Sequence, residues 1–373
     1  MKSLATHAGQ LERWLGREVV EDLSRSMRDW YGPPIAVAGV PGKVFAHAGG
    51  DFRGRIAEGR FSTGLCMAED WLRRLPRVLA KSARKQARFA NTGLGSLSDL
   101  ISEGTTGGKR REWWFKKDGT TGVVAAANSL WRVGALPAAG AAAAAAPGGT
   151  VPDKTTTGAL YNFDNCDPDT RHFVSAWAIA DTSPRNLMLY DRLFAVAKTM
   201  SSTATEAVTG VPSRYQSTTA TDPDSACGNF LFLECGTALS ATAHNWTTCT
   251  YTDQGGAAAT LPSLTGNSGN IINRLDHPVS NWFAPLAAGD VGIQTLTQMQ
   301  CSASVSGALD FVIGHPLVVL PIQVTALACV TDGVNTAFNL VRIFDDACLA
   351  FLEMPRSSTG ATFYNGCITT VAG

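Results

Sequence analysis

The six histidines are the residues best suited to acid–base chemistry near neutral pH, and each stands alone in the sequence. A catalytic imidazole needs a positioned partner, and none of the histidines belongs to a recognised catalytic motif with a carboxylate or a nucleophile. Asp276-His277-Pro278 and Gly314-His315-Pro316 are typical of turns and strand ends, where hydrogen bonds hold a histidine. We therefore predict no catalytic residue. A hydrolase that uses His244, His277 or His315 with a nearby carboxylate stays open as an alternative.

Established catalytic and metal-binding motifs are missing from the sequence. Gly266-Asn267-Ser268-Gly269 has the wrong spacing for a nucleophile elbow, and Gly107-Gly108-Lys109 lacks the first glycine of a phosphate-binding loop. Asp164, Asp167 and Asp169 could contact calcium, but their spacing does not follow the EF-hand pattern. We therefore expect an Asp-rich turn there, with no metal and no cofactor in the protein.

The nine cysteines include no C-x-x-C pair, which argues against zinc and redox sites. Because nine is odd, pairing within one chain cannot use all of them. We predict that most are buried thiols of a protein made in a reducing cytoplasm. Disulfides formed later in an oxidising medium, including between subunits, stay open as an alternative.

A basic stretch with interleaved aromatic residues is the strongest candidate for binding. Residues 71–117 hold twelve Lys and Arg against three acidic residues. Three partners fit this pattern: nucleic-acid phosphates, a membrane surface, and an acidic protein surface such as the acidic half of another copy. We favour protein docking, because no nucleic-acid-binding signature is present and because Arg and Trp dominate interface energetics. The predicted interface residues are Arg73, Arg74, Arg77, Lys109, Arg110, Arg111, Trp113, Trp114, Lys116 and Lys117.

Charge is scarce and unevenly distributed along the chain. Charged residues make up 17% of the sequence, below the usual quarter, which predicts a surface largely covered by partners. A large β-rich domain with Ser and Thr on its faces would explain the same composition. Residues 158–373 hold 8 basic and 17 acidic residues, which is a net charge of −9. Because the net charge of the whole chain is zero, residues 1–157 have a net charge of +9. This asymmetry indicates two kinds of neighbour or head-to-tail contacts between copies.

Hydrophobic spacing divides the chain into four predicted regions. Residues 1–66 hold an amphipathic helix at 9–31 and a hairpin at 35–48. Residues 67–132 form a basic helical and aromatic docking region, with a helical segment at 67–90, a short helix near 94–101 and a run at 107–117 that has a β-like core and basic flanks. Residues 133–157 are an Ala/Gly/Pro-rich linker, predicted to be an exposed connector or an arm along a neighbour. Residues 158–373 form a β-rich body.

Short apolar runs between polar turns predict an antiparallel sandwich or jelly-roll-like fold for this body. The predicted strands cover 173–179, 229–234, 246–251, 291–299, 308–313, 316–324, 337–343 and 361–371. Two helices are predicted among them, one from Ser183-Pro184 to Met200 and a shorter one over 344–354. The predicted fold class is therefore α+β, with a helical, basic N-terminal region. No stretch of 18 or more apolar residues could span a bilayer, and no secretion signal is visible, so no membrane partner is expected.

Four segments of the body resemble stretches in virion structural proteins of tailed phages. They are Asn186–Leu193, Gly210–Tyr215, Ile271–Asp276 and Arg342–Leu349, and none of them is a catalytic signature. The resemblance spans roughly residues 160–370. It implies a particle component that is present in many copies and has no reaction of its own.

A basic arm, a connector and a β-rich body suit a protein that clamps onto a shell. The predicted function is that of a non-enzymatic decoration, cement or minor head protein in the virion, assembled in the host cytoplasm. Its expected partners are the major capsid protein, other virion proteins and copies of itself, with a trimer as one candidate assembly and nucleic acid as a less favoured partner. A tail, spike or vertex protein that binds a host receptor or glycan stays open, as does the hydrolase.

Overall fold

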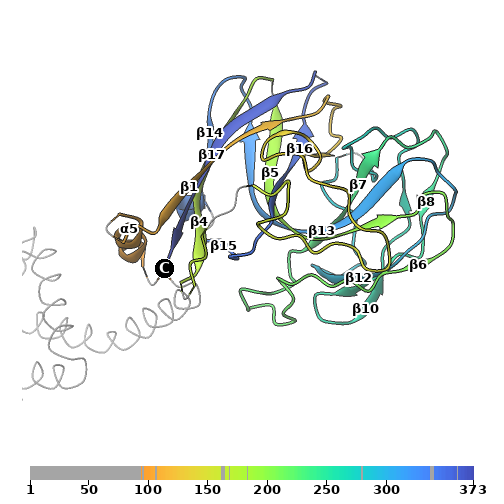
Figure 1. Ribbon diagram of the computed structural model, residues 1–373, viewed down its shortest axis with the longest axis horizontal. Coiled ribbons are helices and arrows are strands. Elements are labelled where there is room, and N and C mark those ends of the chain that lie inside the picture. The colour runs from red at the N-terminus through yellow and green to blue at the C-terminus, as the bar shows by residue number, and fades with distance from the viewer. Residues whose placement is uncertain are drawn as a thin grey trace, which may run out of the picture. The chain divides into compact units, whose positions relative to one another are not determined.

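The computed structural model describes residues 94, 96–105, 107–160, 164–167, 169–182, 184–278, 280–336, 340–358 and 360–373, all within one compact unit, Gln86–Gly373. The helix predicted at 9–31, the hairpin at 35–48, the helical segment at 67–90 and Arg73, Arg74 and Arg77 lie outside these residues. Antiparallel strands dominate the described part (Figure 1). Its helices are α5 (Leu97–Thr105) and the short α6 (Gly333–Thr336).

A six-stranded antiparallel sheet forms one layer, with the order β14-β4-β17-β1-β3 and β15 paired to β4. Its central strands β4 and β17 are ten residues long, and alternate side chains point to its two faces. The strands are β1 (Arg110–Asp118), β3 (Ala135–Leu136), β4 (Arg171–Ala180), β14 (Cys329–Asp332), β15 (Arg342–Ile343) and β17 (Phe363–Ala372).

A five-stranded antiparallel sheet, ordered β2-β16-β5-β13-β7, forms the central layer. Its two longest strands are β5 and β13, whose mutual register shifts at Ile313/Gly314 and again at Pro316/Val318. Pro316 is tolerated in β13 because it stands at this irregularity, where its missing N–H breaks no regular ladder. The strands are β2 (Asn128–Ser129), β5 (Arg185–Lys198), β7 (Phe230–Thr237), β13 (Ala308–Ile322) and β16 (Leu349–Pro355).

The two halves of β5 and β13 serve two different hydrophobic cores. Leu187 and Leu320 pack with Phe115, Phe351 and Ile368 between the five- and six-stranded sheets, and the Phe115 and Phe351 ring centroids lie 4.7 Å apart. The other half packs against a four-stranded sheet, ordered β10-β9-β12-β6. The smaller strands of this second sandwich are β6 (Glu206–Ala207), β8 (Asn245–Trp246), β9 (Thr250–Asp253), β10 (Ala258–Thr260), β11 (Leu264–Thr265) and β12 (Ile293–Met299).

The structure confirms a mainly antiparallel, sandwich-like body, but two of the predicted helices are wrong. Residues 185–198 and 349–355 are the strands β5 and β16. Both strands are buried on both faces, so apolar residues occupy successive positions and hide the alternation of a half-exposed strand. In β5, Leu187 and Leu189 face one core while Met188 and Tyr190 face another. The short helix expected near 94–101 is confirmed as α5.

The Ala/Gly/Pro-rich segment 133–157 lies along the five-stranded sheet of its own chain. Ala197 donates its N–H to the Ala144 carbonyl (2.9 Å), and Thr150 and Ala195 exchange two backbone hydrogen bonds (2.7 and 2.9 Å). These contacts continue the sheet beside β5, beyond the place where β16 pairs with it. The segment thereby covers part of a sheet edge. The four-region division of the chain, and the role of this segment between copies, stay predictions.

Candidate assembly surface

Strand β1 carries most of the described residues that the sequence predicts as an interface. From Glu112 to Asp118 its exposed and buried residues alternate, as they do in a strand with one face on a core. Trp114 at its centre is 59% exposed, and Arg110 and Lys116 are also exposed. Arg111, just inside the strand, is exposed and donates to the Gly108 carbonyl. The predicted docking region therefore contains a solvent-facing strand face.

Two of the predicted interface residues lie beneath this surface instead. Trp113 is 5% exposed and belongs to the core between the two sheets, where the Arg171 guanidinium lies 5.6 Å from its ring centroid. Lys117 is 1% exposed, and its ammonium donates to the carbonyls of Val133 (2.5 Å) and Pro137 (3.1 Å). Burial lowers the pKa of Lys117 to about 8. Both side chains support the strand, and neither is available to a partner.

An apolar row crosses the outer face of the six-stranded sheet at the level of Trp114. Directly opposite residues of neighbouring strands share a face, and the register places Trp114 opposite Cys367, Cys367 opposite Trp177, and Trp177 opposite Val330. The two indole rings meet edge to face with centroids 5.4 Å apart, and Val330 is 67% exposed. Cys367 lies covered between them. We call these four residues the tryptophan row.

Charged residues flank the tryptophan row along β1. On the outer face, Arg110 and Glu112 precede Trp114, and Lys116 and Asp118 follow it, so their signs alternate along the strand. Arg110 forms an ion pair with Glu112, and the Lys116 ammonium lies 5.8 Å from the ring centroid of Phe363. An aromatic centre within a charged rim is the usual anatomy of a protein–protein contact.

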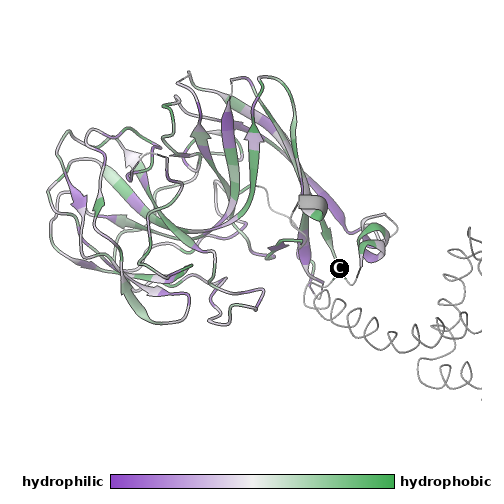
Figure 2. Cartoon of the chain, turned by 180° about the vertical axis from the view of Figure 1, so that it is seen from behind, coloured by the Kyte–Doolittle hydropathy of each residue, from purple (hydrophilic) through white to green (hydrophobic). Residues whose placement is uncertain are grey.

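Helix α5 covers one end of the same outer face. Leu94 and Leu100 pack on Val371, which stands opposite Arg110 and therefore shares the face of Trp114. In Figures 1 and 2 the helix lies on the side of the six-stranded sheet that faces away from the rest of the body. Lys109, which follows the helix, is held between Glu103 (2.9 Å) and Asp169 (2.8 Å). Beyond the helix, Trp114 and Val330 of the tryptophan row are exposed to solvent.

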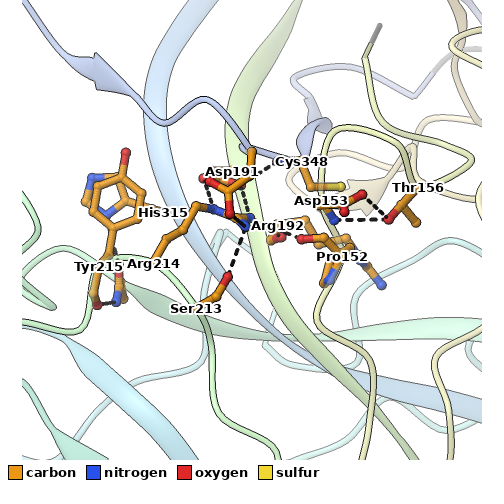
Figure 3. A network of polar contacts seen from close by, with 12 residues as sticks. Pro152, Asp153, Thr156, Asp191, Arg192, Ser213, Arg214, Tyr215, His315 and Cys348 are labelled. Atoms are coloured by element: carbon orange, nitrogen blue, oxygen red, sulfur yellow. Dashed lines mark hydrogen bonds and ion pairs between the residues drawn. The ribbon is translucent and has the colours of Figure 1, made fainter. Parts of the chain in front are cut away.

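A buried charge network surrounds strand β5 of the central sheet (Figure 3). Arg214 binds the Asp191 carboxylate through two hydrogen bonds, Nε to Oδ2 (2.9 Å) and Nη2 to Oδ1 (2.7 Å). Asp191 also accepts the backbone N–H of Cys348 (2.9 Å), and Arg214 donates to the Pro152 carbonyl (3.2 Å). Asp191 is fully buried and Arg214 is 3% exposed. The pair joins β5 to three loops.

A second part of the network centres on Glu234. Its carboxylate accepts hydrogen bonds from Arg192 (2.7 Å) and Arg132 (3.0 Å), and Arg132 also pairs with Asp310. Burial by itself would raise the pKa of Glu234, but the two guanidinium groups outweigh it and hold this pKa below its usual value. Arg192 also lies over the ring of Trp131, 4.5 Å from its centroid. Opposite charges balance within this group.

The network brings together three of the four segments that resemble phage virion proteins. Asp191 and Arg192 come from the first segment, Arg214 from the second and Cys348 from the fourth. The third segment reaches β7 through backbone hydrogen bonds, among them Cys235 N–H to the Arg274 carbonyl (3.1 Å). Residues in these segments therefore make contacts that stabilise the body. Because the segments lie far apart in the sequence, these contacts could not be predicted from it.

The three histidines of the alternative hydrolase hypothesis occupy different surroundings. His244 contacts Asp276 Oδ2 through Nε2 (2.9 Å) and the Thr242 carbonyl through Nδ1 (3.0 Å), so both ring nitrogens face acceptors. The hydrogen bond to Asp276 raises the pKa of His244, as expected for an imidazolium. The side chains of this pair are fully buried, and Trp246 donates to the same carboxylate oxygen (2.8 Å). This arrangement resembles a structural ion pair, because both side chains are fully buried and bonded to protein groups.

The other two histidines have no carboxylate at hydrogen-bonding distance among their described contacts. His277 lines a cavity of about 230 Å³ together with Asn267, Asn270 and Arg274. His315 contacts the side-chain oxygen of Asn229 through Nδ1 (2.8 Å) and stacks on Tyr215, with ring centroids 3.9 Å apart. Within the described residues, no group of three His, Cys, Asp or Glu could hold a metal, and no helix is long and apolar enough to cross a membrane.

Comparison with known proteins leaves the chain without an assigned family. No family model matches it, and no curated protein matches it. A structure titled "Structure of infectious bursal disease virus Gt strain" aligns over 70% of this chain and 79% of that chain, with 9% identity and a TM-score of 0.17. The crystal structure of the infectious bursal disease virus VP2 subviral particle aligns over 73% and 85%, with 10% identity and a TM-score of 0.16. TM-scores this low do not show a shared fold, so these likenesses carry no argument.

Truncating the two adjacent tryptophans should separate fold from surface. We expect Trp113→Ala to lower the free energy of unfolding by about 3–5 kcal/mol, because it empties a core position. Trp114→Ala should change it by less than about 1 kcal/mol, because most of that ring is in solvent. Denaturant unfolding of both variants measures this, and equal losses would contradict the assignment of the two faces.

Proposed function

We propose that the chain is a non-enzymatic structural protein of a phage particle, attached to the capsid as a decoration, cement or minor head protein. The observation that carries this proposal is the tryptophan row, an exposed aromatic centre with a charged rim on an otherwise well-packed body. Trp and Arg are the residue types that contribute most to interface energies. The resemblance of four segments to virion proteins of tailed phages supports the particle context.

The chemistry of the described residues also favours a structural role. Among the described residues, His244 and Asp276 form the closest His–carboxylate pair, and both are buried and hydrogen-bonded to other protein groups. Within the network, Asp191, Glu234 and Asp310 neutralise Arg214, Arg192 and Arg132. In this proposal the buried charged residues stabilise the fold, and the protein functions by binding partners through its surface.

Incorporation of a Trp114→Ala variant into particles tests the proposed use of this surface. Loss of a central interface tryptophan typically costs 2 kcal/mol or more, so we expect about 30-fold weaker incorporation at limiting protein concentration. Val291→Ala is the matched control, because it truncates an exposed apolar side chain (54%) that lies on the second sandwich. Equal occupancy of particles by wild type and Trp114→Ala would contradict the proposal for this surface.

A receptor- or glycan-binding tail, spike or vertex protein is the second candidate. The exposed Trp114, packed edge to face on the half-buried Trp177, favours it, because aromatic faces stack on sugar rings. Quenching or shifting of tryptophan fluorescence by host-cell glycans, lost in Trp114→Ala, would support this candidate. Binding to shells without any glycan response would favour capsid attachment.

A further inference from the structure

The outer face of β1 has a charge pattern that is complementary to itself. Strand β1 spans Arg110–Asp118, and Trp114 is its middle residue. The outward-facing side chains on either side of it read basic, acidic, Trp, basic, acidic, from Arg110 and Glu112 to Lys116 and Asp118. If two copies are related by a two-fold axis so that their β1 strands run antiparallel and cross at Trp114, each basic residue stands opposite an acidic one.

We propose that two copies of the chain pair through the outer face of the six-stranded sheet, with their β1 strands crossing antiparallel at Trp114. This inference names the partner of the surface described above and so rests on its proposed use in assembly. Glu112 of each copy would then face Lys116 of the other, and Arg110 would face Asp118. A two-fold contact uses one patch on both copies, so such a patch must be complementary to itself.

The apolar residues of this face support the same arrangement. The tryptophan row extends from Trp114 to one side over β17, β4 and β14, and Leu136 of β3, 50% exposed, lies on the other side. A two-fold axis that reverses β1 runs along the tryptophan row, so the rotation places Trp177 and Val330 of one copy over the same residues of the other. Sheets that pack face to face keep their strands within about 30° of alignment, so the charged residues next to Trp114 stay within reach.

The size of the face sets the strength that we expect. Four strands spaced about 4.8 Å apart and roughly 25 Å long present on the order of 500 Å² of flat sheet. A standard-size interface buries about 800 Å² per partner. A weak dimer is therefore expected, with a dissociation constant in the micromolar range, and attachment at many sites on a particle would strengthen it.

Charge reversal at two positions provides a sharp test. Sedimentation velocity of the full chain is measured from about 1 to 100 µM for wild type, Glu112→Lys, Lys116→Glu and the double variant. Each single reversal creates two like-charge contacts by symmetry, so we expect at least a 10-fold weaker dimer. The double variant restores both opposite-charge contacts, so we expect its dimerisation to return to within about three-fold of wild type.

Controls separate pairing from folding. Arg356→Glu reverses an exposed charge just beyond β16, away from this face, and should dimerise like wild type. Thermal unfolding shows whether the single variants fold, and only folded variants that lose the dimer count in favour of pairing. A monomeric wild type at 100 µM, a dimer unchanged by Lys116→Glu, or no recovery in the double variant would each overturn the inference.

Binding to shells distinguishes this inference from the proposed function. A wild-type chain that binds shells as a monomer would overturn the two-fold contact and leave capsid attachment standing. A chain that dimerises through Glu112 and Lys116 but never binds shells would leave the contact standing and overturn capsid attachment.

Discussion

Replacing Arg214 with methionine should lower the free energy of unfolding by about 3–5 kcal/mol. The variant leaves the Asp191 carboxylate fully buried without its guanidinium partner, and the Cys348 N–H alone cannot compensate that charge. It also frees the carbonyls of Pro152 and Arg192, which Arg214 now binds at 3.2 Å. Urea unfolding of the purified chain measures the loss.

An exposed ion pair is the matched control for this experiment. Arg342 binds Asp224 (2.6 Å), but the two side chains are 33% and 44% exposed, so Arg342→Met should cost less than about 1 kcal/mol. A double variant, Arg214→Met with Asp191→Leu, removes both buried charges and should be more stable than Arg214→Met alone. A loss for Arg214→Met no greater than that for Arg342→Met would contradict a structural role for the network.

Acidification from pH 7 to pH 5 should destabilise the protein through three histidines whose pKa burial lowers, namely His315 and the two most buried ones, His172 and His277. His172 is fully buried and His277 is 3% exposed, and burial lowers the pKa of each to about 4, from an ordinary value of 6.5. The unfolded chain therefore binds more protons, so the stabilisation is complete above pH 6.5 and is lost as the pH falls toward 4. Each histidine should account for about 2 kcal/mol between pH 7 and pH 5.

Unfolding free energies across this pH range test the assignment. His277→Asn removes one titrating group, so its stability should fall less steeply with acidification than that of wild type. His244 acts in the opposite sense, because Asp276 raises its pKa and stabilises the charged ring. His244→Asn should therefore steepen the loss. A wild-type stability that stays flat from pH 7 to pH 5 would contradict the burial argument.

Strands with one solvent face were the elements that the sequence revealed most clearly. The segments predicted at 173–179 and 361–371 are β4 and β17, whose outer residues are partly exposed and give the expected alternation. Strands β5 and β16 lie between two cores, and their continuous apolar runs have the composition of a buried helix. These two segments are strands because they lie between two packed layers of the fold, and no local sequence pattern indicates that position.

The candidate surface was only half predictable for a related reason. Alternation along β1 separates Trp113 from Trp114, but it does not say which of them faces the core. The packing of Phe115 on Phe351 decides that, across more than 200 residues of sequence. Likewise, Trp177 and Val330 join Trp114 only through strand pairing, and the Asp191–Arg214 contact links β5 to a distant loop. Register between distant strands leaves no mark on the local sequence.

The most direct test of the account is cosedimentation of the full-length chain with phage shells that lack it, followed by imaging of the bound density. We expect saturable binding and ordered density at repeated positions on the shell, with weaker binding by Trp114→Ala. Absence of binding, together with stable oligomers in free solution, would contradict capsid attachment and favour a tail or receptor-binding component.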